Sequence, residues 1–289
     1  DGGAGFDPIG FPQNETGFSG TFDGEGHNIT RLTVNRSGRL VDFGLFGTVA
    51  GSGTVKNVSV VDAVVRGDSG VGILVGFNEG TVERSSATGV VYGSGNAIGG
   101  LVGSNFGGTI SKSFADVTVD GSLGTTGVGG LSGANTDGLI ENTYAVSDID
   151  GSNYVGGLVG ANYGRIAASY TASDVDADGS GREGGFVGVN DGTVDGSYWD
   201  KEATEPSSSP AGVGLTTQEM TGNSSVDNMT ALDFNRTWQK SDEYPKLSWE
   251  MRKDDTNESP GFGSTTVVLA IVAVILLVLV SVIAVRRAE

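Results

Sequence analysis

A glycine-rich tetrapeptide that recurs at a nearly constant interval is the feature that most constrains this fold. Residues 155–164 read VGGLVGANYG, and near-copies begin at Phe43, Gly72, Ile98, Val128 and Glu183. The last glycines of the successive tetrads are separated by 29, 27, 30, 27 and 28 residues. These glycines are Gly47, Gly76, Gly103, Gly133, Gly160 and Gly188. Intervals in this range indicate stacked structural repeats, each of which completes its core only against its neighbours.

Alignment of the repeats produces columns of similar residues. One apolar column contains Leu45, Leu74, Leu101, Leu131, Leu158 and Phe186, and a second contains Val55, Val82, Ile110, Ile140, Ile166 and Val194. An asparagine column lies two residues after the tetrad glycines and contains Asn78, Asn105, Asn135, Asn162 and Asn190. Identical amides stacked about 4.8 Å apart can hydrogen-bond from one repeat to the next. An aromatic column contains Phe114, Tyr144, Tyr170 and Tyr198.

These columns favour an all-β chain folded as a parallel β-helix, or β-solenoid, of about six to seven coils. No segment has the length and the 3.6-residue period of a helix within the repeats. A propeller blade needs four strands and a longer repeat, and a leucine-rich repeat needs several leucines per unit, so both agree less well with the pattern. We expect a right-handed coil by analogy with other β-helices.

Composition excludes several classes of function. Lys and Arg total 17 against 35 Asp and Glu, and the net charge of −18 argues against binding to nucleic acid or to anionic lipid surfaces. The chain has no cysteine, which excludes disulfides, thiol nucleophiles and thiolate metal sites. Its one histidine, His27, lies in a turn-rich opening and is read as structural. Zinc sites and Ser-His-Asp catalysis therefore lack the residues that they need.

The C-terminus contains a predicted transmembrane helix. Residues 265–285 are 21 residues without a charge, enough for a helix of roughly 31 Å. Arg286 and Arg287 follow directly, so the positive-inside rule predicts that residues 286–289 form a cytoplasmic tail and that residues 1–264 lie outside the cell. The chain begins at Asp1 and shows no signal peptide, so we interpret it as a mature or truncated chain.

The repeats resemble the GLUG motif of microbial surface proteins. The resemblance covers roughly residues 6–249 and includes the opening sequences FDPIG and GTFDGEGHNI and the core GGLVGxNxG. It continues in the closing sequences SYWDKE, GLTT and YPKL. Proteins with this motif include immunoglobulin A-cleaving proteases and large adhesin-like chains. A further strand often precedes FDPIG in such proteins, so the resemblance implies a chain cut at its N-terminus.

The domain boundaries follow from where the period begins and ends. We expect a solenoid with an N-terminal opening coil over residues 1–199 and a C-terminal capping region over residues 200–250. The capping region and its boundary collect all three tryptophans, Trp199, Trp238 and Trp249, which we expect to cover the hydrophobic end of the last coil. A carbohydrate-binding aromatic platform is the alternative use of these residues.

A polar linker at residues 251–264 precedes the predicted helix and contains Pro260, Gly261 and Phe262. The order of this tripeptide, an apolar helix and terminal arginines resembles the PGF-CTERM sorting signal of haloarchaea. The resemblance implies that an archaeosortase trims the helix and leaves a lipid-attached C-terminus. The acidic composition is consistent with such a source.

Acidic residues before the glycines that end the second extended run are the candidate metal ligands. Asp120, Asp150 and Asp178 hold this position, and we expect consecutive coils to place them in one column. Solvated acidic turns, a Ca²⁺ site and carboxylate catalysis are the three interpretations. Asp174 to Gly179 match the start of an EF-hand loop, but its twelfth position is Gly185 instead of glutamate, so that pattern fails.

Eight Asn-x-Ser/Thr sequons predict glycosylation, and none lies between Asn57 and Asn223. They are at Asn14, Asn28, Asn35, Asn57, Asn223, Asn228, Asn235 and Asn257. The central coils, where the ladder asparagines must stay unmodified, are therefore free of sequons.

Together these features predict a non-enzymatic, membrane-anchored and glycosylated cell-surface protein that serves in adhesion, envelope contact or spacing. We expect no cofactor, with Ca²⁺ as the one ion considered, and surface glycans or envelope proteins as partners besides the membrane and the archaeosortase. The alternative is a polysaccharide-active β-helix enzyme, a lyase or a glycosidase, that uses Asp120, Asp148, Asp150 or Asp176. A third hypothesis is a Ca²⁺-stabilised surface binding module.

Overall fold

The computed structural model describes residues 3–10, 17–36, 42–121, 125–177 and 181–254. The chain divides into two compact units, Asp1–Trp249 and Glu250–Glu289, and the first unit contains the repeats. The predicted PGF motif, the apolar segment 265–285 and the basic tail lie outside the described residues. Among the residues that are described, no helix is long and apolar enough to cross a membrane.

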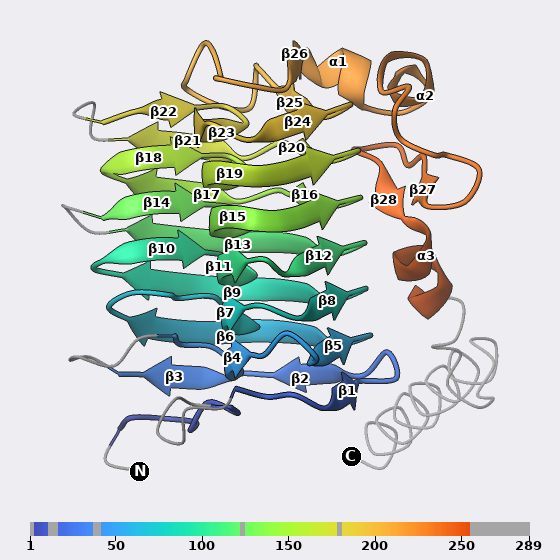
Figure 1. The fold of residues 1–289 in the computed structure, drawn as a ribbon. Helices are drawn as coiled ribbons and strands as arrows, with labels where there is room; N and C mark the ends of the chain where they lie inside the picture. Colours follow the sequence, from blue (N-terminus) through green and yellow to red (C-terminus); the bar gives the residue numbers. More distant parts are fainter. Residues whose placement is uncertain (1–2, 11–16, 37–41, 122–124, 178–180, 255–289) are drawn as a thin grey trace, which may run out of the picture. The chain divides into compact units, whose positions relative to one another are not determined.

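In the described residues the repeats form a stack of coils whose strands build three parallel sheets, two with eleven strands and a third to which only four coils contribute (Figure 1). Sheet A has eleven strands: β2 (Asn28–Thr30), β3 (Thr33–Asn35), β6 (Ser59–Gly67), β9 (Ser86–Gly93), β13 (Phe114–Gly121), β16 (Tyr144–Ala145), β17 (Asp148–Gly151), β20 (Tyr170–Thr171), β21 (Asp174–Ala177), β25 (Tyr198–Asp200) and β26 (Val213–Leu215). Sheet C has four strands: β10 (Asn96–Gly99), β14 (Thr126–Gly129), β18 (Asn153–Gly156) and β22 (Glu183–Gly184).

Sheet B completes each coil. Its eleven strands are β1 (Thr21–Asp23), β4 (Phe46–Val49), β5 (Thr54–Lys56), β7 (Val75–Asn78), β8 (Thr81–Glu83), β11 (Val102–Phe106), β12 (Thr109–Ser111), β15 (Ser132–Glu141), β19 (Val159–Ala167), β23 (Val187–Asn190) and β24 (Thr193–Asp195). Neighbouring strands in sheets A, B and C are parallel and come from successive coils, as in the pairing of Asn105 with both Asn78 and Asn135. The prediction of an all-β parallel solenoid is therefore confirmed.

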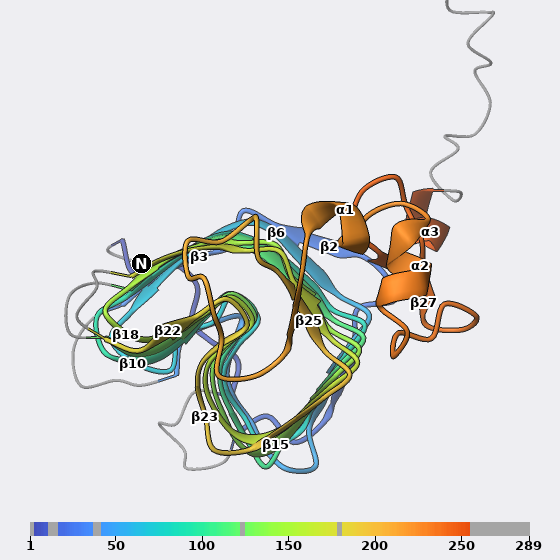
Figure 2. The same cartoon turned by 90° about the horizontal axis from the view of Figure 1, so that it is seen from above.

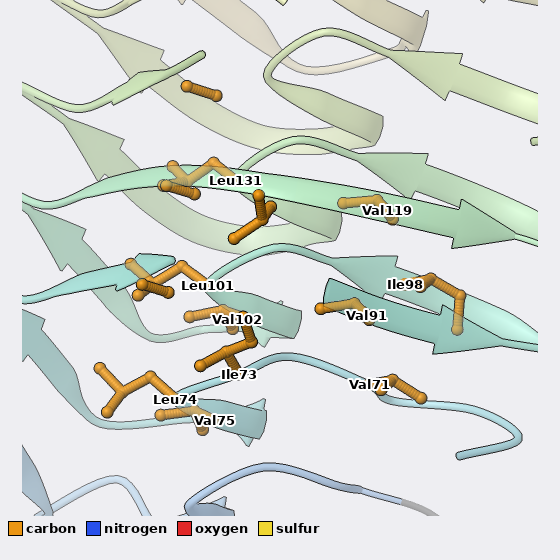
Figure 3. Close-up of a cluster of buried hydrophobic side chains, with 14 of the residues drawn as sticks. Val71, Ile73, Leu74, Val75, Val91, Ile98, Leu101, Val102, Val119 and Leu131 are labelled. Atoms are coloured by element: carbon orange, nitrogen blue, oxygen red, sulfur yellow. The ribbon is translucent and has the colours of Figure 1, made fainter. Parts of the chain in front are cut away.

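The two apolar columns point into the coils and form the core. Every member of the leucine column is at most 4% exposed. In the second column Val55, Val82 and Ile110 pair in register on successive coils, and only Val194 at its end is half-buried. Figure 3 shows Leu74, Leu101 and Leu131 one above another within this core. The hydrophobic periodicity of the sequence thus identified the interior correctly.

The last glycine of each tetrad lies where the chain folds back on itself. Seen along the stack, sheet C runs inward and the chain then reverses into sheet B (Figure 2). A Cβ atom on Gly103 would lie 2.6 Å from the backbone carbonyl carbon of Gly70 and from the backbone oxygen of Gly76. Packed sheets with side chains between them are usually about 10 Å apart, so this backbone contact requires glycine. The repeat is glycine-rich because the coil is indented at this point.

A corner between sheets B and A repeats a left-handed backbone residue followed by a hydroxyl side chain. The corner residues have φ between 47° and 55°, and they are Asn57, Arg84, Lys112, Asn142, Ala168 and Gly196. All except Asn57, which precedes Val58, are followed by serine or threonine. The hydroxyl oxygens that follow accept from the backbone of the preceding coil, as when Ser113 Oγ accepts from Ser85 N at 3.1 Å. The sequence analysis did not identify this second ladder, because serine and threonine are common in the turns of any β protein.

One part of the predicted capping region closes the end of the core. Residues 208–215 cross the last coil, where Ser209 Oγ accepts hydrogen bonds from the backbone nitrogens of Phe186 and Val187 at 3.1 Å. Strand β26 then pairs in parallel with β25. Ala211 packs against the apolar core, so this stretch covers its last layer.

The remainder, residues 216–249, runs along the side of the coils, and we call it the lateral segment (Figure 1). It contains α1 (Thr217–Met220), α2 (Ser224–Asn228) and an antiparallel pair, β27 (Trp238–Gln239) with β28 (Lys246–Leu247), and it ends in the first residues of α3 (Ser248–Asp254). It buries Trp238, Met220 and Met229 against the aromatic column instead of against the end of the core. The capping region thus covers both the end of the core, as the sequence predicted, and the aromatic column, which the sequence did not predict.

The aromatic column explains why the lateral segment lies there. Phe114 stacks on Tyr144 with ring centroids 4.7 Å apart, and Tyr144 stacks on Tyr170 at 5.1 Å. Trp249 stacks on Phe114, and its Nε1 donates to the backbone oxygen of Lys112 at 2.8 Å. The tryptophans are thus used in packing, since Trp199 and Trp238 are buried, which contradicts the alternative of an exposed tryptophan platform for carbohydrate.

Candidate functional site

Acidic side chains gather on the outer face of sheet A. In β13, β17 and β21 the residues Val119, Ile149 and Val175 point into the core and are at most 3% exposed. Because side chains alternate along a strand, the residues on either side of these three point outward. Two outer columns result: Thr118, Asp148 and Asp174 in one, and Asp120, Asp150 and Asp176 in the other.

The structure corrects the predicted acidic column at its last member. Asp150 pairs with Asp176, and Gly151 pairs with Ala177, so Asp178 is not the counterpart of Asp150. Asp178 itself lies outside the described residues. The sequence alignment used the glycine after the run as its reference, but Gly179 comes two residues later in its coil than Gly151 does. The strand pairing, which starts from Tyr144 and Tyr170, shows the true register.

Two adjoining hollows lie over these columns. The larger has a volume of about 410 Å³ and is lined by Asp116, Thr118, Ser147, Asp148 and Asp174, among others, with Ala203 from the C-terminal region. The smaller, of about 220 Å³, is lined by Asp120, Asp148, Asp150, Asp174 and Asp176 together with Thr118, Val119 and Ile149. We call the two hollows the acidic groove. Asp116, Thr118 and Ser147 were not among the residues that the sequence singled out.

An arginine and a tyrosine continue the acidic column on the preceding coils. Asp120 pairs with Tyr92, and Tyr92 pairs with Arg66. The guanidinium carbon of Arg66 lies 3.5 Å from the centroid of the Tyr92 ring, within cation–π range. The acidic groove therefore has an aromatic ring and a cation at one end, which no motif in the sequence indicated because they come from different repeats.

The spacing of the carboxylates allows acid–base chemistry but does not specify it. Residues on adjacent coils are about 4.8 Å apart, and residues two apart along a strand are about 6.6 Å apart. Glycosidases use carboxyl pairs at about 5–5.5 Å or about 6.5–9.5 Å. Asp148, Asp150, Asp174 and Asp176 are exposed and Asp120 is half-buried. Exposed carboxylates lack the apolar burial through which enzymes prepare a general acid.

Within the described residues, no group of three or more histidine, aspartate or glutamate side chains is arranged to hold a metal ion. Asp120 and Asp150 do lie in one column, but their side chains lie on an open sheet face. His27 is exposed beside the first strand of sheet A. The acidic columns place exposed carboxylates beside one another on neighbouring strands.

The asparagine column forms a continuous hydrogen-bonded ladder inside the solenoid. Nδ2 of each asparagine donates to Oδ1 of the next, at 2.7 Å from Asn78 to Asn105, 2.8 Å for the two middle bonds and 2.7 Å from Asn162 to Asn190. Each Nδ2 also reaches a backbone oxygen in its own turn, for example Asn78 to Gly80 at 3.3 Å. The ladder starts at Asn78, whose Oδ1 is buried without a hydrogen-bond partner because Val49 occupies the position below.

The predicted glycosylation sites differ in accessibility. Asn28, Asn35, Asn223, Asn228 and Asn235 are exposed, whereas Asn57 is half-buried. Asn57 has a left-handed backbone, and its Nδ2 donates to Asp23 at 2.9 Å. Asn14 and Asn257 lie outside the described residues. The five exposed sites are those where a glycan would meet the least obstruction.

Comparison with known proteins supports the repeat and the fold. The GLUG motif profile matches residues 94–120, which run from the turn before β10 through most of β13. A structure of a proposed immunoglobulin A1 protease from Bacteroides ovatus superposes with a TM-score of 0.66 over 84% of this chain and 81% of that chain. Its sequence is 23% identical, so this likeness shows a shared fold.

Two relatives share part of the sequence. Halomucin of Haloquadratum walsbyi is 41% identical over 88 residues, which are 30% of this chain and 1% of halomucin. A protein of Evansella cellulosilytica with the proposed name Gly-rich membrane protein is 35% identical over 89 residues, 29% of this chain and 10% of that protein. The match thus spans a small part of either relative. The chain is a parallel β-solenoid that carries the GLUG motif.

Proposed function

We propose that this chain is a non-enzymatic, cell-surface-anchored solenoid that serves as a rigid spacer or contact element of the cell envelope. The observation that carries this proposal is the uninterrupted asparagine ladder, which joins five successive coils through four amide hydrogen bonds of 2.7–2.8 Å. A structure held in this way resists bending between coils and needs no single reactive site. Rigid extension is therefore the property that the repeats provide.

Similarity supports the location at the surface. One relative is named halomucin and the other Gly-rich membrane protein, and each matches nearly a third of this chain. The residues after 254 would supply the anchor, with Pro260, Gly261 and Phe262 as the processing signal and residues 265–285 as the trimmed helix. The exposed sequons Asn28, Asn35, Asn223, Asn228 and Asn235 would carry glycans in this role.

The location is tested by expressing the full chain behind a secretory signal peptide in a haloarchaeal host that carries an archaeosortase. We expect external protease to digest the chain on intact cells and mass spectrometry to show a C-terminus that lacks residues 265–289. A Phe262→Ala variant should keep these residues, and a Phe234→Ala variant is a matched control outside the signal. An intact C-terminus in the unaltered chain, or a chain protected inside intact cells, would contradict the proposal.

A polysaccharide-active enzyme is the second candidate function. The acidic groove favours it, because carboxylates, a tyrosine and an arginine follow one another along one outer column. A lyase or glycosidase would use two of Asp120, Asp148, Asp150 and Asp176 as acid and base, and Tyr92 as a surface for a sugar ring.

Turnover assays on acidic and neutral polysaccharides separate the two candidates. The surface-spacer proposal predicts no release of reducing ends or unsaturated products above background. The enzyme hypothesis predicts turnover that Asp150→Asn removes, whereas Asp227→Asn, on an exposed acid of α2 outside the groove, preserves it. A Ca²⁺-stabilised module would instead show a lower unfolding temperature after chelation at constant ionic strength.

A further inference from the structure

Two exposed aromatic side chains lie in one column on the outer surface of sheet B. Phe106 is 45% exposed and Tyr163 is 43% exposed, which makes them the two most exposed of the exposed aromatic side chains in the described residues. Both pair with Thr136, Phe106 from the coil below and Tyr163 from the coil above. The Cα atoms of the two residues are therefore about 9.6 Å apart along the stack, with the small side chain of Thr136 between them.

The position of these residues is fixed by the asparagine ladder. Phe106 directly follows Asn105 and Tyr163 directly follows Asn162, and both asparagines are buried and hydrogen-bonded to the same ladder. Phe106 is further supported by Phe77, with ring centroids 5.9 Å apart in a stacked arrangement. Binding to rings held in this way costs little conformational entropy, because they are already ordered on a rigid sheet.

The surroundings indicate the chemistry of a ligand. Glu79 and Asp191 occupy the same position after the ladder asparagines Asn78 and Asn190, and both are exposed. Carboxylates accept hydrogen bonds and donate none, so a ligand that spans the column must bring donors such as hydroxyl groups. The chain's net charge of −18 disfavours anionic ligands.

The size of the patch argues against a protein partner. Three aromatic rings flanked by acids are much smaller than the roughly 800 Å² per partner of a standard protein interface. A linear sugar chain has both properties that the column requires: apolar C–H faces that stack on aromatic rings at regular intervals, and hydroxyl groups that donate to carboxylates.

We propose that Phe106 and Tyr163, supported by Phe77, bind a neutral polysaccharide that runs along the axis of the solenoid. Sugar rings stack on the two aromatic side chains, and the carboxylates of Glu79 and Asp191 accept hydroxyl hydrogen bonds at the ends of the column. This site lies on sheet B, whereas the acidic groove lies on sheet A. It adds a ligand to the surface role and does not rest on the membrane anchor.

The experiment is isothermal titration calorimetry on the full 289-residue chain in detergent, with a panel of neutral α- and β-linked hexasaccharides. We expect at least one neutral hexasaccharide to bind, and the Phe106→Ser/Tyr163→Ser double variant to bind it at least about twentyfold more weakly, since each stacked ring contributes about fivefold. Phe6→Ser, which removes a ring of 41% exposure elsewhere, should leave the affinity unchanged.

Two further ligands test whether the site binds an anionic sugar or a cation instead of a neutral sugar. Hexagalacturonate represents an anionic sugar and spermine represents a cation. The proposal is overturned if no neutral hexasaccharide binds, if only spermine or hexagalacturonate binds, or if the double variant binds as tightly as the unaltered chain. Equal unfolding temperatures of the variants and the unaltered chain show that the comparison concerns binding and not folding.

Discussion

The asparagine ladder shows how single residues determine this structure and how far the sequence reveals them. Its five members share one position relative to the tetrad, so alignment alone predicts the column that the hydrogen bonds display. The acidic column could not be predicted in the same way. Its last member was placed at Asp178 instead of Asp176, because the coil length changes in the turn after the strand. Residues counted from a strand keep their register, whereas residues counted across a turn do not.

Two substitutions, Asn105→Val within the ladder and Val49→Asn at its lower end, test how much the ladder contributes to the free energy of unfolding. Asn105→Val removes the acceptor of Asn78 Nδ2 and the donor to Asn135 Oδ1, so we expect a loss of about 2–5 kcal/mol in the free energy of unfolding. Val49→Asn places an amide beside the unpaired Oδ1 of Asn78 and should cost less than about 1 kcal/mol. Denaturant unfolding measures both, and a Val49→Asn loss as large as that of Asn105→Val would contradict the ladder as a stabilising element.

Asp42 makes the free energy of unfolding depend on pH, with lower stability at higher pH. Burial raises the pKa of Asp42 from 3.8 to about 6, and a hydrogen bond from Thr48 opposes part of this rise. Between pH 4 and pH 6 the native chain therefore holds a proton that the unfolded chain has lost, so the free energy of unfolding falls as the pH rises through this window. Asp42→Asn should remove that slope and stabilise the chain by about 1–2 kcal/mol at pH 7, after allowance for solvent screening. Asparagine also tolerates the left-handed backbone at this position, where φ is 74°.

Asp23 is the matched control of opposite sign. A hydrogen bond from Asn57, followed by those from the Glu25 backbone and Lys56, lowers the pKa of Asp23 from 3.8 to about 2. Its contribution to stability is present above pH 4 and is lost as the pH falls through about 2. Asp23→Asn should therefore destabilise the chain at pH 7, where Asp42→Asn stabilises it. Unfolding curves at pH 4, 5, 6 and 7 distinguish the two, and equal changes in both variants would refute the assignment.

At the scale of elements, the lateral segment is the part that the sequence revealed least. Its large residues were expected at the end of the core, but they cover the aromatic column because that column faces outward from sheet A. Periodicity predicts that Phe114, Tyr144 and Tyr170 stack. It does not indicate on which face of sheet A they lie, because both faces of the sheet are covered there and carry apolar side chains. The lateral segment ends over Phe114, the first aromatic member of the column, since Ser86 precedes it on the coil below.

The Tyr244–Asp200 contact fixes the lateral segment to the last coil. The Tyr244 hydroxyl donates to Oδ2 of Asp200 at 2.6 Å, and Asp200 is 1% exposed. Burial, and then the neighbouring Asp200, raise the pKa of Tyr244 well above its ordinary value of 10, so the hydroxyl remains a donor. Tyr244→Phe leaves a buried carboxylate oxygen without this donor and should cost about 1–3 kcal/mol.

Hydrogen exchange shows which part of the chain loses stability in the Tyr244→Phe variant. We expect faster exchange in residues 216–249 of the Tyr244→Phe variant and unchanged exchange in strands β7 to β12. Tyr163→Phe removes a hydroxyl from an exposed ring and serves as the control. Faster exchange throughout the solenoid, or none in the lateral segment, would show that this contact does not hold the segment.

At the scale of the whole molecule, the coils are interchangeable units of one continuous core. Successive coils pair in parallel through sheets A and B, and four of them also pair through sheet C. The tetrad glycines from Gly76 to Gly188 repeat the same close backbone contact. Stability in such stacks is approximately a sum of coil terms and interface terms. The account of this protein as a spacer requires that a coil can be removed without loss of the fold.

Deletion of residues 78–104 removes one complete coil. Phe77 pairs with Ser104 and Asn78 pairs with Asn105, so the deletion joins Phe77 to an asparagine of the same register. The acidic columns of β13, β17 and β21 and the lateral segment remain in the shortened chain. Deletion of residues 78–94 is the control, because it removes part of a coil and shifts the apolar columns out of register.

Thermal unfolding of the 78–104 deletion variant, followed by circular dichroism, is the most direct test of this account. We predict one cooperative transition at a somewhat lower temperature than in the complete chain, with the β signal per residue preserved, while the 78–94 variant shows no cooperative transition. A 78–104 variant without a cooperative transition would contradict the claim that the coils are equivalent units of one solenoid.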